Sequence, residues 1–356
     1  MSDIYSPKNR RAYRVHAGIT PPQRTPWGGR RIIDTYKPEL ALEGPVGEAW
    51  EISVSELPSR LEDGALLSER IATAPEAWLG TDAWRNTPLL VKLLDTAQPL
   101  SVQIHPSDDD PALAADESGK PEAWYVLHAE PGAGLWIGFA DGVDDAAIRA
   151  AIADEEDVSR LLRFVEVQPG DFFVIDPGTP HAIGAGLTLV EPQRVVPGKR
   201  GLTYRYWDWN RRYDAAGRAS DQGEPRALHL ERALAVSDFE RDWDAWMARA
   251  WRRLGVPALE SAARLETLSD AVLGVSRLTG TGTQTLDVTE LIGITVVDGS
   301  VRVEGADGSI TLGRGRSGVL PAWLGATTLH AQSAHALLTW IPYFSGARRA
   351  SPSDPE

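Results

Sequence analysis

The chain contains no cysteine among its 356 residues, which excludes disulfides and thiolate metal sites. Any metal ion must therefore be held by nitrogen and oxygen ligands. Long apolar runs are also missing, so no segment is predicted to span a bilayer. The polar N-terminal stretch lacks the apolar core of a signal peptide, and we expect a soluble, cytoplasmic protein.

Positive charge is scarce as well, with 36 Lys and Arg against 50 Asp and Glu and a net charge of -14. This balance argues against nucleic acid or an anionic membrane as the partner. A small anionic ligand would need a local cluster of basic side chains. The length allows two domains, and the 33 Gly, 25 Pro and short, turn-bounded strand patterns favour all-β modules.

One stretch, residues 92–109, organises the candidate chemistry. Residues 100–105 alternate between apolar and polar types, which predicts a strand with Gln103 and His105 on one face. Pro106 ends this strand because it has no N–H to donate. An amide oxygen and an imidazole that point into a cavity suit zinc. The alternative interpretation is a histidine in a satisfied polar pocket, because short patterns match by accident.

Two later segments strengthen the metal hypothesis. Residues 121–127 predict a strand that begins near Glu122, which is either a water-exposed carboxylate or a third oxygen ligand. Residues 170–184 predict a strand, a Pro-Gly bend and then His181, and they resemble the second motif of cupins, the jelly-roll barrels that hold a metal inside. Together these side chains give a four-ligand set: Gln103, His105, Glu122 and His181. Such a set leaves zinc with net positive charge, which makes it a Lewis acid.

Six stretches along the chain resemble type I phosphomannose isomerases of the short bacterial form. They are WGG (27–29), GEAWEIS (47–53), PLLVKLLDTAQPLSVQIHPSD (88–108), GKPEAWY (119–125), PGTPHAIGAG (177–186) and TYRYWDWNR (203–211). They cover the first two thirds of the chain, and the second to fifth are specific. The resemblance implies a mainly β fold of two cupin-type jelly-roll β-barrels with helical insertions. It also implies one zinc ion per chain, held in the first barrel.

The resemblance further implies an activity and roles for individual residues. It implies an aldose–ketose isomerase that interconverts mannose 6-phosphate and fructose 6-phosphate by zinc-assisted proton transfer through a cis-enediolate. It gives catalytic roles to Lys120, Glu191 and Arg205 and places Ser101 and Lys92 near the substrate. The four metal ligands are those named above. The expected partner is a small phosphosugar, and a monomer is compatible with the sequence.

The segment between the acid and the arginine departs from the family pattern. The short bacterial enzymes typically carry Q-Q-N-S-D there, whereas this chain has PQRVVPGKRGL (192–202). The rewritten segment adds Lys199 and Arg200 and loses the family's Asn-Ser-Asp. Arg200 therefore competes with Arg205 for the catalytic role, or binds the phosphate from the rim of the site. A solvated basic loop is the other interpretation, because charge runs are usually solvated.

Two catalytic assignments stay open at this point. Arg205 is favoured as the catalytic arginine because Thr203, Arg205 and Trp207 are expected to share one strand face. The proton-transfer base is either Lys120 or Glu191. Burial beside zinc would lower the pKa of Lys120 and give a neutral amine, whereas a charged Lys120 would bind a substrate oxygen.

The predicted organisation has five parts: a polar arm (1–12), a catalytic zinc-binding cupin domain (13–222) with helical insertions at about 59–86 and 143–164, a helical connector (223–256), a metal-free cupin-like domain (257–347) and a tail (348–356). His330 and His335 are interpreted as structural or exposed.

The alternative function is a metal-binding cupin of another class, either a sugar-binding regulatory module or a metal-dependent oxygenase. An oxygenase would favour iron with histidine ligands, and a carboxamide ligand is unusual for it.

Overall fold

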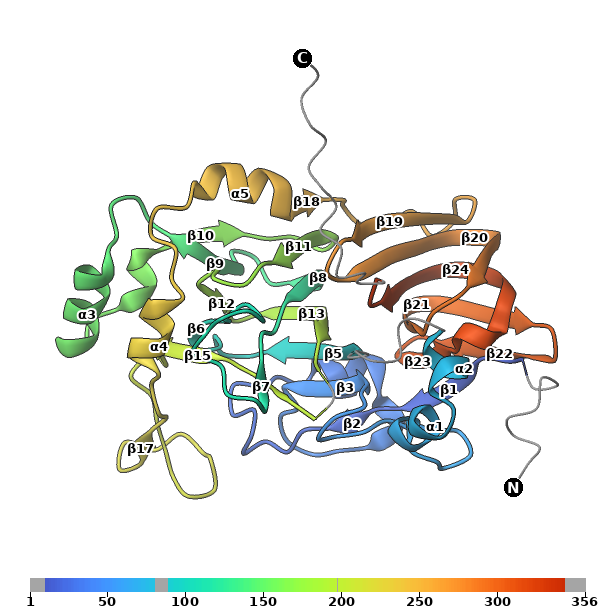
Figure 1. Cartoon of the computed structure of the whole chain (residues 1–356), viewed down its shortest axis with the longest axis horizontal. Coiled ribbons are helices and arrows are strands. Elements are labelled where there is room, and N and C mark those ends of the chain that lie inside the picture. Colours follow the sequence, from blue (N-terminus) through green and yellow to red (C-terminus); the bar gives the residue numbers. More distant parts are fainter. Residues whose placement is uncertain (1–9, 81–88, 197, 343–356) are drawn as a thin grey trace, which may run out of the picture.

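The computed structural model describes residues 10–80, 89–196 and 198–342. The predicted tail (348–356), most of the predicted arm and residues 81–86 of the first predicted insertion lie outside these ranges. Figure 1 shows two β-rich halves side by side, with helices at their periphery. Within the described residues, no helix combines the length and the apolar composition needed to cross a membrane.

The first half is a sandwich of two antiparallel sheets (Figure 1). The seven-stranded sheet has the order β18 (Trp251–Arg253), β11 (Asp171–Ile175), β8 (Glu122–Ala129), β13 (Leu187–Arg194), β5 (Leu89–Thr96), β3 (Glu48–Ile52) and β2 (Gly18–Ile19). The five-stranded sheet has the order β10 (Leu162–Glu166), β9 (Gly134–Phe139), β12 (His181–Ile183), β6 (Val102–Ile104) and β15 (Tyr204–Trp207). Residues of both sheets, including Trp124, Ile137 and Phe173, are fully buried in one apolar cluster. Burial of this cluster supplies the main driving force for the first half to fold.

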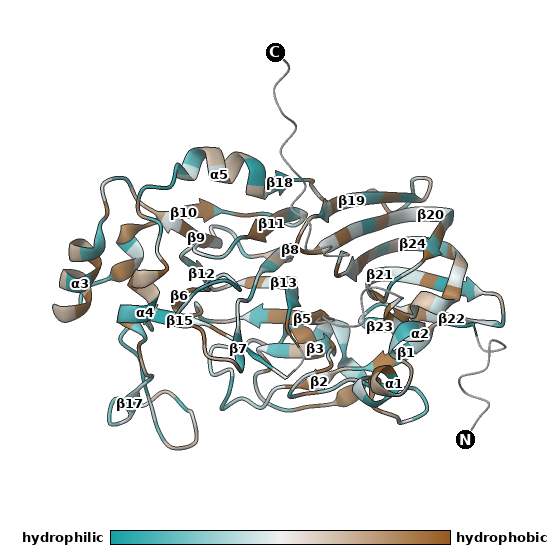
Figure 2. Cartoon of the chain, in the orientation of Figure 1, coloured by the Kyte–Doolittle hydropathy of each residue, from teal (hydrophilic) through white to brown (hydrophobic). Residues whose placement is uncertain are grey.

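The second half is one eight-stranded sheet that curves around its own core. Its order is β19 (Arg264–Asp270), β20 (Gly274–Val288), β24 (Gly325–Trp340), β21 (Ile292–Gly305), β23 (Arg316–Leu320), β1 (Tyr13–His16) and β4 (Arg60–Leu61), and β22 (Gly308–Gly313) pairs with β21. Register shifts interrupt the ladders of the long strands β20, β21 and β24, and such irregularities bend a strand. Figure 2 shows hydrophobic positions distributed along the strands of both halves.

The two halves share strands and buried polar contacts. Tyr13 of β1 pairs with Val319 of β23, so β1 lies in the sheet of the second half, although the predicted catalytic domain includes it. Glu51 of β3 accepts hydrogen bonds from the Lys37 ammonium at 3.0 Å and from the Ser317 hydroxyl at 2.8 Å. Because all three side chains are buried, the halves meet along an ordered interface. The predicted domain boundaries stay a prediction.

Helices lie in all three regions where the sequence predicts them. The first insertion contains α1 (Leu67–Thr73) and α2 (Pro75–Leu79), the second contains α3 (Asp145–Ala153) and the 3-10 helix η4 (Val158–Leu161), and the connector contains α4 (Leu230–Ala235) and α5 (Trp243–Ala250). The Asp144 carboxylate caps α3 by accepting from the N–H of Ala147. The second insertion was predicted too long, because its last residues form β10, which pairs with β9.

The remaining elements are short and lie in connections. They are η1 (Ile32–Tyr36), η2 (Pro38–Leu40), η5 (Ala322–Leu324), β7 (Glu117–Ser118), β14 (Arg200–Gly201), β16 (Arg212–Tyr213) and β17 (Glu224–Pro225). Two of these pairs border the site described next: β14 pairs with β7, and β16 pairs with β17.

Candidate metal centre and active site

Strand β6 places the first group of predicted site residues on the five-stranded sheet. Gln103 pairs directly with His181 of β12 on one side and with Arg205 of β15 on the other. Directly paired residues of neighbouring strands project from the same face. Gln103, His181 and Arg205 therefore form a row across three strands, and His105 follows two residues after Gln103.

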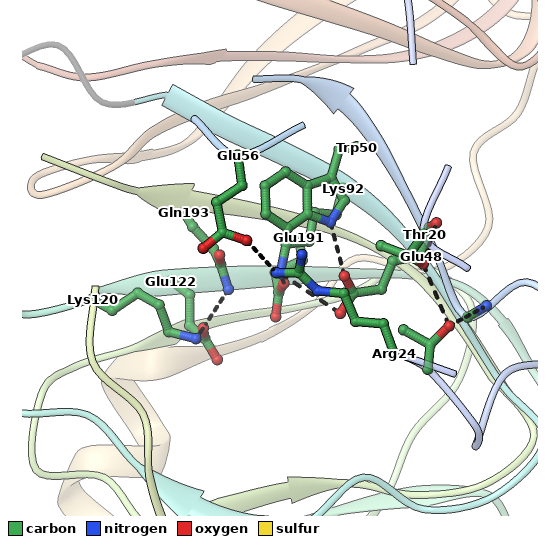
Figure 3. A network of polar contacts seen from close by, with 12 residues as sticks. Thr20, Arg24, Glu48, Trp50, Glu56, Lys92, Lys120, Glu122, Glu191 and Gln193 are labelled. Atoms are coloured by element: carbon green, nitrogen blue, oxygen red, sulfur yellow. Dashed lines mark hydrogen bonds and ion pairs between the residues drawn. The ribbon is translucent and has the colours of Figure 1, made fainter. Parts of the chain in front are cut away.

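The seven-stranded sheet supplies the second group. Glu122 of β8 pairs with Gln193 of β13, and Glu191 of β13 pairs with Lys92 of β5. The Gln193 amide donates to Glu122 Oε2 at 2.8 Å. Figure 3 shows the side chains of these four residues gathered in one polar network. The site therefore lies between the two sheets, with each sheet contributing charged and polar groups.

Two histidines and one carboxylate lie close enough to share a metal ion. The ligand atoms of His105, Glu122 and His181 all lie within 4.8 Å of one another, and all three side chains are buried. His105 Nε2 lies 3.3 Å from Glu122 Oε2, and His181 Nε2 lies 3.3 Å from Glu122 Oε1. The side-chain amide of Gln103 lies 3.2 Å from His181 Nε2, so the predicted fourth ligand borders the same group.

Backbone carbonyls orient both imidazoles. His105 Nδ1 donates to the Leu202 carbonyl at 3.0 Å, and His181 Nδ1 donates to the Thr179 carbonyl at 2.9 Å. Each ring therefore keeps Nε2 unprotonated and close to the Glu122 carboxylate, which is the arrangement seen around metal-binding histidines. Gly178 has a φ of 75°, a conformation that favours glycine, and its N–H donates to the His105 carbonyl at 2.9 Å. The Pro-Gly bend that precedes β12 is thus bonded to the backbone of His105.

The chemical state of this group suits a divalent cation. Among the described residues, His105 Nε2 and Glu122 Oε1 are buried without a hydrogen-bond partner, and each such atom costs about 1–3 kcal/mol. Burial and the charge of Lys120 lower the pKa of His105 to about 4. Burial alone would raise the pKa of Glu122, but His105 and Lys120 hold it well below its usual range. A neutral imidazole and an ionised carboxylate are the forms that bind metals.

A cavity of about 260 Å³ opens beside the metal-binding group. Six of the residues predicted from the sequence line it: Lys92, Ser101, Gln103, Lys120, Glu191 and Arg205. Nine further lining residues were not predicted as site residues: Arg24, Trp27, Glu48, Trp50, Leu94, Leu100, Gln193, Thr203 and Arg226. Glu48 and Trp50 are separated by one residue in β3, so the two-residue period of a strand could have signalled their shared face. Arg24 and Arg226 lie in connections, where no such periodicity exists.

A buried lysine and its acidic neighbours define the charge of the cavity. Lys92 Nζ lies 3.3 Å from Glu191 Oε2 and 3.8 Å from Glu48 Oε1. Burial would lower the pKa of Lys92, but these acids outweigh it and raise the value. Burial raises the pKa of Glu191 to about 7. The indole N–H of Trp124 donates to Glu191 Oε1 at 3.1 Å, so both carboxylate oxygens of this residue are oriented.

The structure places the two competing arginines differently. Arg205 lines the cavity, whereas Arg200 is not among its lining residues. The Arg200 side chain is 64% exposed and forms ion pairs with Asp116 at 3.3 Å and Glu117 at 3.0 Å. Strand β14 pairs in parallel with β7, so the rewritten segment packs along the loop that precedes Lys120. In this conformation Arg200 lies at the surface.

A bulge in β15 separates Trp207 from the strand face that carries Arg205. Arg205 pairs with Gln103, but Trp207 pairs with Val102, so the register shifts by one residue between the two pairs. Val102 and Gln103 are adjacent in β6 and point to opposite faces. The prediction that Trp207 shares the face of Arg205 is therefore wrong, and Trp207 packs in the apolar cluster of the first half.

Comparisons with known proteins agree with the motifs. Residues 21–136 match the family model described as phosphomannose isomerase type I, catalytic domain. A mannose-6-phosphate isomerase of Streptococcus mutans is 35% identical over 215 residues, which are 59% of this chain and 63% of that protein. Mannose-6-phosphate isomerase ManA of Bacillus subtilis is 37% identical over 150 residues, or 42% of this chain and 44% of that protein. The chain thus aligns with less than two thirds of the length of each relative.

The solved structures extend the likeness to nearly the whole chain at the level of fold. The crystal structure of the mannose 6-phosphate isomerase from Bacillus subtilis superposes with a TM-score of 0.72 at 23% identity. The superposition covers 93% of this chain and 99% of that chain. The predicted mainly β fold with helical insertions is confirmed, and so is the resemblance inferred from the motifs.

Proposed function

We propose that this chain interconverts mannose 6-phosphate and fructose 6-phosphate, because residues 21–136 match the family model of the type I phosphomannose isomerase catalytic domain. The observation that carries the proposal is the convergence of distinct chemical groups on one cavity. An amide of the metal-binding group, a lysine, an acid and an arginine line this cavity together: Gln103, Lys120, Glu191 and Arg205. An aldose–ketose isomerase needs such a combination, because it must polarise oxygens and move a proton between neighbouring carbons.

The proposed cofactor is one zinc ion, held by Gln103, His105, Glu122 and His181. A set of two imidazoles, one carboxylate and one carboxamide, in a chain without cysteine, suits this borderline cation. The two unpartnered buried atoms of His105 and Glu122 support the assignment. When bound, zinc supplies positive charge that stabilises negative charge developing on the substrate oxygens.

We assign the proton transfer to Glu191 and a substrate-oxygen contact to Lys120. Glu191 faces the cavity with both oxygens held, one by the Trp124 indole and the other beside the Lys92 ammonium. A carboxylate fixed in this way takes a proton from one carbon and returns it to the neighbouring carbon. Lys120 Nζ lies 3.7 Å from Glu122 Oε2, next to the metal-binding group, where the oxygens of the reacting carbons would lie.

The remaining cavity residues bind and orient the substrate in this proposal. The planar fork of Arg205 donates two parallel hydrogen bonds to a developing oxyanion. Ser101 and Lys92 contact substrate hydroxyl oxygens from the cavity wall. Arg200 remains a predicted contact at the rim, and it must leave Asp116 and Glu117 to reach a substrate.

An assay coupled to fructose 6-phosphate formation tests the proposal. The zinc-loaded protein should convert mannose 6-phosphate, should lose turnover after treatment with a chelator, and should recover turnover when zinc is restored. Unchanged turnover in metal-free protein would contradict the metal assignment. Oxygen consumption with a sugar, in place of isomerisation, would favour the oxygenase alternative.

A further inference from the structure

Two arginines of the cavity, Arg24 and Arg226, lie outside every family-like motif of the sequence, and Arg226 is the one held by a buried carboxylate. Arg226 lines the cavity and follows β17 directly. Its Nε donates to Asp208 Oδ2 at 2.7 Å, and its Nη2 donates to Asp208 Oδ1 at 2.8 Å. Only 4% of the Asp208 side chain is exposed. Two parallel bonds to a buried carboxylate fix the plane of the Arg226 guanidinium.

The fixed guanidinium keeps one nitrogen unpaired. Within the described part of the chain, neither a hydrogen bond nor an ion pair involves Arg226 Nη1. The ring of Tyr213 lies 5.7 Å from the centre of this guanidinium. The Nε and Nη2 groups of Arg226 are thus bonded to Asp208, while its Nη1 group can donate to a molecule in the cavity. This is the arrangement expected of a ligand-binding arginine.

Positive charge accumulates around this point although the whole chain is acidic. Asp208 accepts from both Arg226 and Arg211, and Arg205 donates its Nη1 to the carbonyl of Ala227, the residue after Arg226. Burial and the neighbouring Arg226 charge lower the pKa of Arg205. Arg205 Nε is buried without a hydrogen-bond partner. Two arginines thus pair with one carboxylate, and the third, Arg205, has no ion-pair partner among the described residues, which leaves an excess of positive charge for an anion to neutralise.

These groups follow one another along the cavity wall, from the metal-binding group through Arg205 to Arg226. Gln103 belongs to the metal-binding group, Arg205 is its neighbour across the strand pair, and Arg226 lies beyond Arg205. The reacting carbons of the sugar lie at one end of the molecule and the phosphate lies at the other. A substrate with its carbonyl end near the metal-binding group would extend its far end toward Arg226.

We propose that Arg226, positioned by Asp208, binds the substrate phosphate and selects phosphorylated over unphosphorylated hexoses. The inference rests on the proposed isomerase function. Arg226 directly follows the β16–β17 hairpin, which Figure 1 shows extending from the first half beside β15 and α4. Asp208 is the positioning residue, since it holds Arg226 without reaching the substrate itself.

Steady-state kinetics of Arg226→Ala with mannose 6-phosphate and with mannose tests the selection. We expect kcat/KM for mannose 6-phosphate to fall about a hundredfold, mostly through KM, because a binding contact common to ground and transition states is lost. The value for mannose should stay unchanged. Arg226→Lys keeps the charge without the fork and should recover part of the loss, and Asp208→Asn should lower the preference for the phosphorylated sugar less than Arg226→Ala does. Arg218→Ala is the matched control, because this arginine of the same hairpin is 79% exposed.

Calorimetric titration of the zinc-loaded protein with inorganic phosphate gives a readout that does not depend on turnover. Wild type should bind phosphate, and Arg226→Ala should bind it at least about thirtyfold more weakly. Equal losses with both sugars, or phosphate affinity unchanged in Arg226→Ala and Arg226→Lys, would overturn the inference. If wild type bound phosphate through Arg226 but isomerised no sugar, the proposed function would fail while the phosphate site stood.

Discussion

The two halves of the molecule share a β-rich architecture and apolar clusters, but they differ in the polar groups that lie among their buried side chains. Between the sheets of the first half lie Glu122 and His181, each with 0% exposure, together with the half-buried amide of Gln103. The core of the second half is apolar, and Val301 and Leu329 are fully buried in it. Polar groups in a core cost stability unless they are paired, so their concentration in one half marks a functional site.

The histidines of the two halves also differ in their roles. Among the described residues, only one group of His and acidic side chains has the geometry of a metal site, and it lies in the first half. In the second half, His335 Nε2 pairs with the Tyr125 hydroxyl at 3.0 Å, and His330 lies near the surface with Glu304. These positions agree with the structural or exposed roles expected for both residues. The second half therefore supports the first through its interface, and we expect its variants to affect stability without affecting chemistry.

Removal of a metal ligand should have the largest effect. We expect His105→Ala to lose most of its zinc and to reduce kcat by more than about a thousandfold, because the charge that stabilises the substrate oxygens is lost. Its far-UV circular dichroism should resemble that of wild type, since the apolar clusters do not depend on the metal. His330→Ala is the matched histidine variant and should keep full turnover. Normal turnover in His105→Ala would refute the ligand assignment.

Removal of the cavity arginine should have the next largest effect. Arg205→Ala is expected to lower kcat by at least about a hundredfold, on the scale of losing one preorganised oxyanion donor. Circular dichroism and zinc content should stay at wild-type values, which separates lost chemistry from lost structure. A change confined to KM would show that Arg205 contributes only uniform binding.

A cavity in the apolar core of the second half should lower stability and leave turnover unchanged, the opposite of the two preceding variants. Leu329 is 0% exposed, and Leu329→Ala should lower the free energy of unfolding by about 2–5 kcal/mol through lost burial and the cavity left behind. Turnover per folded molecule should remain within about twofold of wild type, because Leu329 lies outside the catalytic cavity. Urea unfolding and kcat measured on one preparation check both points. A large loss of kcat with little destabilisation would show that the second half takes part in catalysis.

The pH dependence of stability should report on His335. Burial and Arg277 lower the pKa of His335 to about 4 in the folded state, against about 6.5 in the unfolded chain. Between these values the unfolded chain binds a proton that the folded protein does not, so stability falls as the pH is lowered through this window. From pH 7 to pH 5 this histidine should account for a loss of about 2 kcal/mol.

His335→Gln isolates this contribution, since the amide replaces the imidazole and does not titrate. Urea unfolding of the zinc-loaded proteins at pH 7 and pH 5 should show a smaller loss for the variant. The same loss in both proteins would contradict the assignment to His335.

The surface arginine should give the smallest effect. Arg200→Ala should leave kcat within a few-fold and raise KM modestly, because its exposed ion pairs with Asp116 and Glu117 hold it outside the cavity. Steady-state kinetics alongside Arg205→Ala checks the ranking. If Arg200→Ala abolished turnover and Arg205→Ala did not, the rewritten segment would supply the catalytic arginine.

The sequence predicts the candidate site best where neighbouring residues determine which way a side chain points. The two-residue period of a strand is enough to put Gln103 and His105 on one side, and the Pro-Gly bend marks the approach to His181. The strand pattern offers Glu122 as one of two interpretations, and the resemblance to a family adds Arg205, which no spacing connects to the histidines. Zinc as the bound metal and the individual catalytic roles remain predictions.

The features that escaped prediction depend on contacts between distant segments. Strand β1 pairs with β23 across about 300 residues, and no local pattern of Tyr13 or Val319 indicates this partner. The bulge in β15 turns Trp207 away from the Arg205 face, and it is visible only from the pairing with β6. Arg226 reaches the cavity because Asp208 holds it there, and a hydrogen bond between two connections leaves no periodic signal.

Zinc content tests the contrast between the halves most directly. Wild type, His105→Ala and His330→Ala would be purified in parallel, saturated with zinc, freed of loosely bound metal and measured by inductively coupled plasma mass spectrometry. We expect about one zinc per chain in wild type and in His330→Ala, and less than about a tenth of that in His105→Ala. One zinc per chain in His105→Ala, or its loss in His330→Ala, would contradict the assignment of the metal site to the first half.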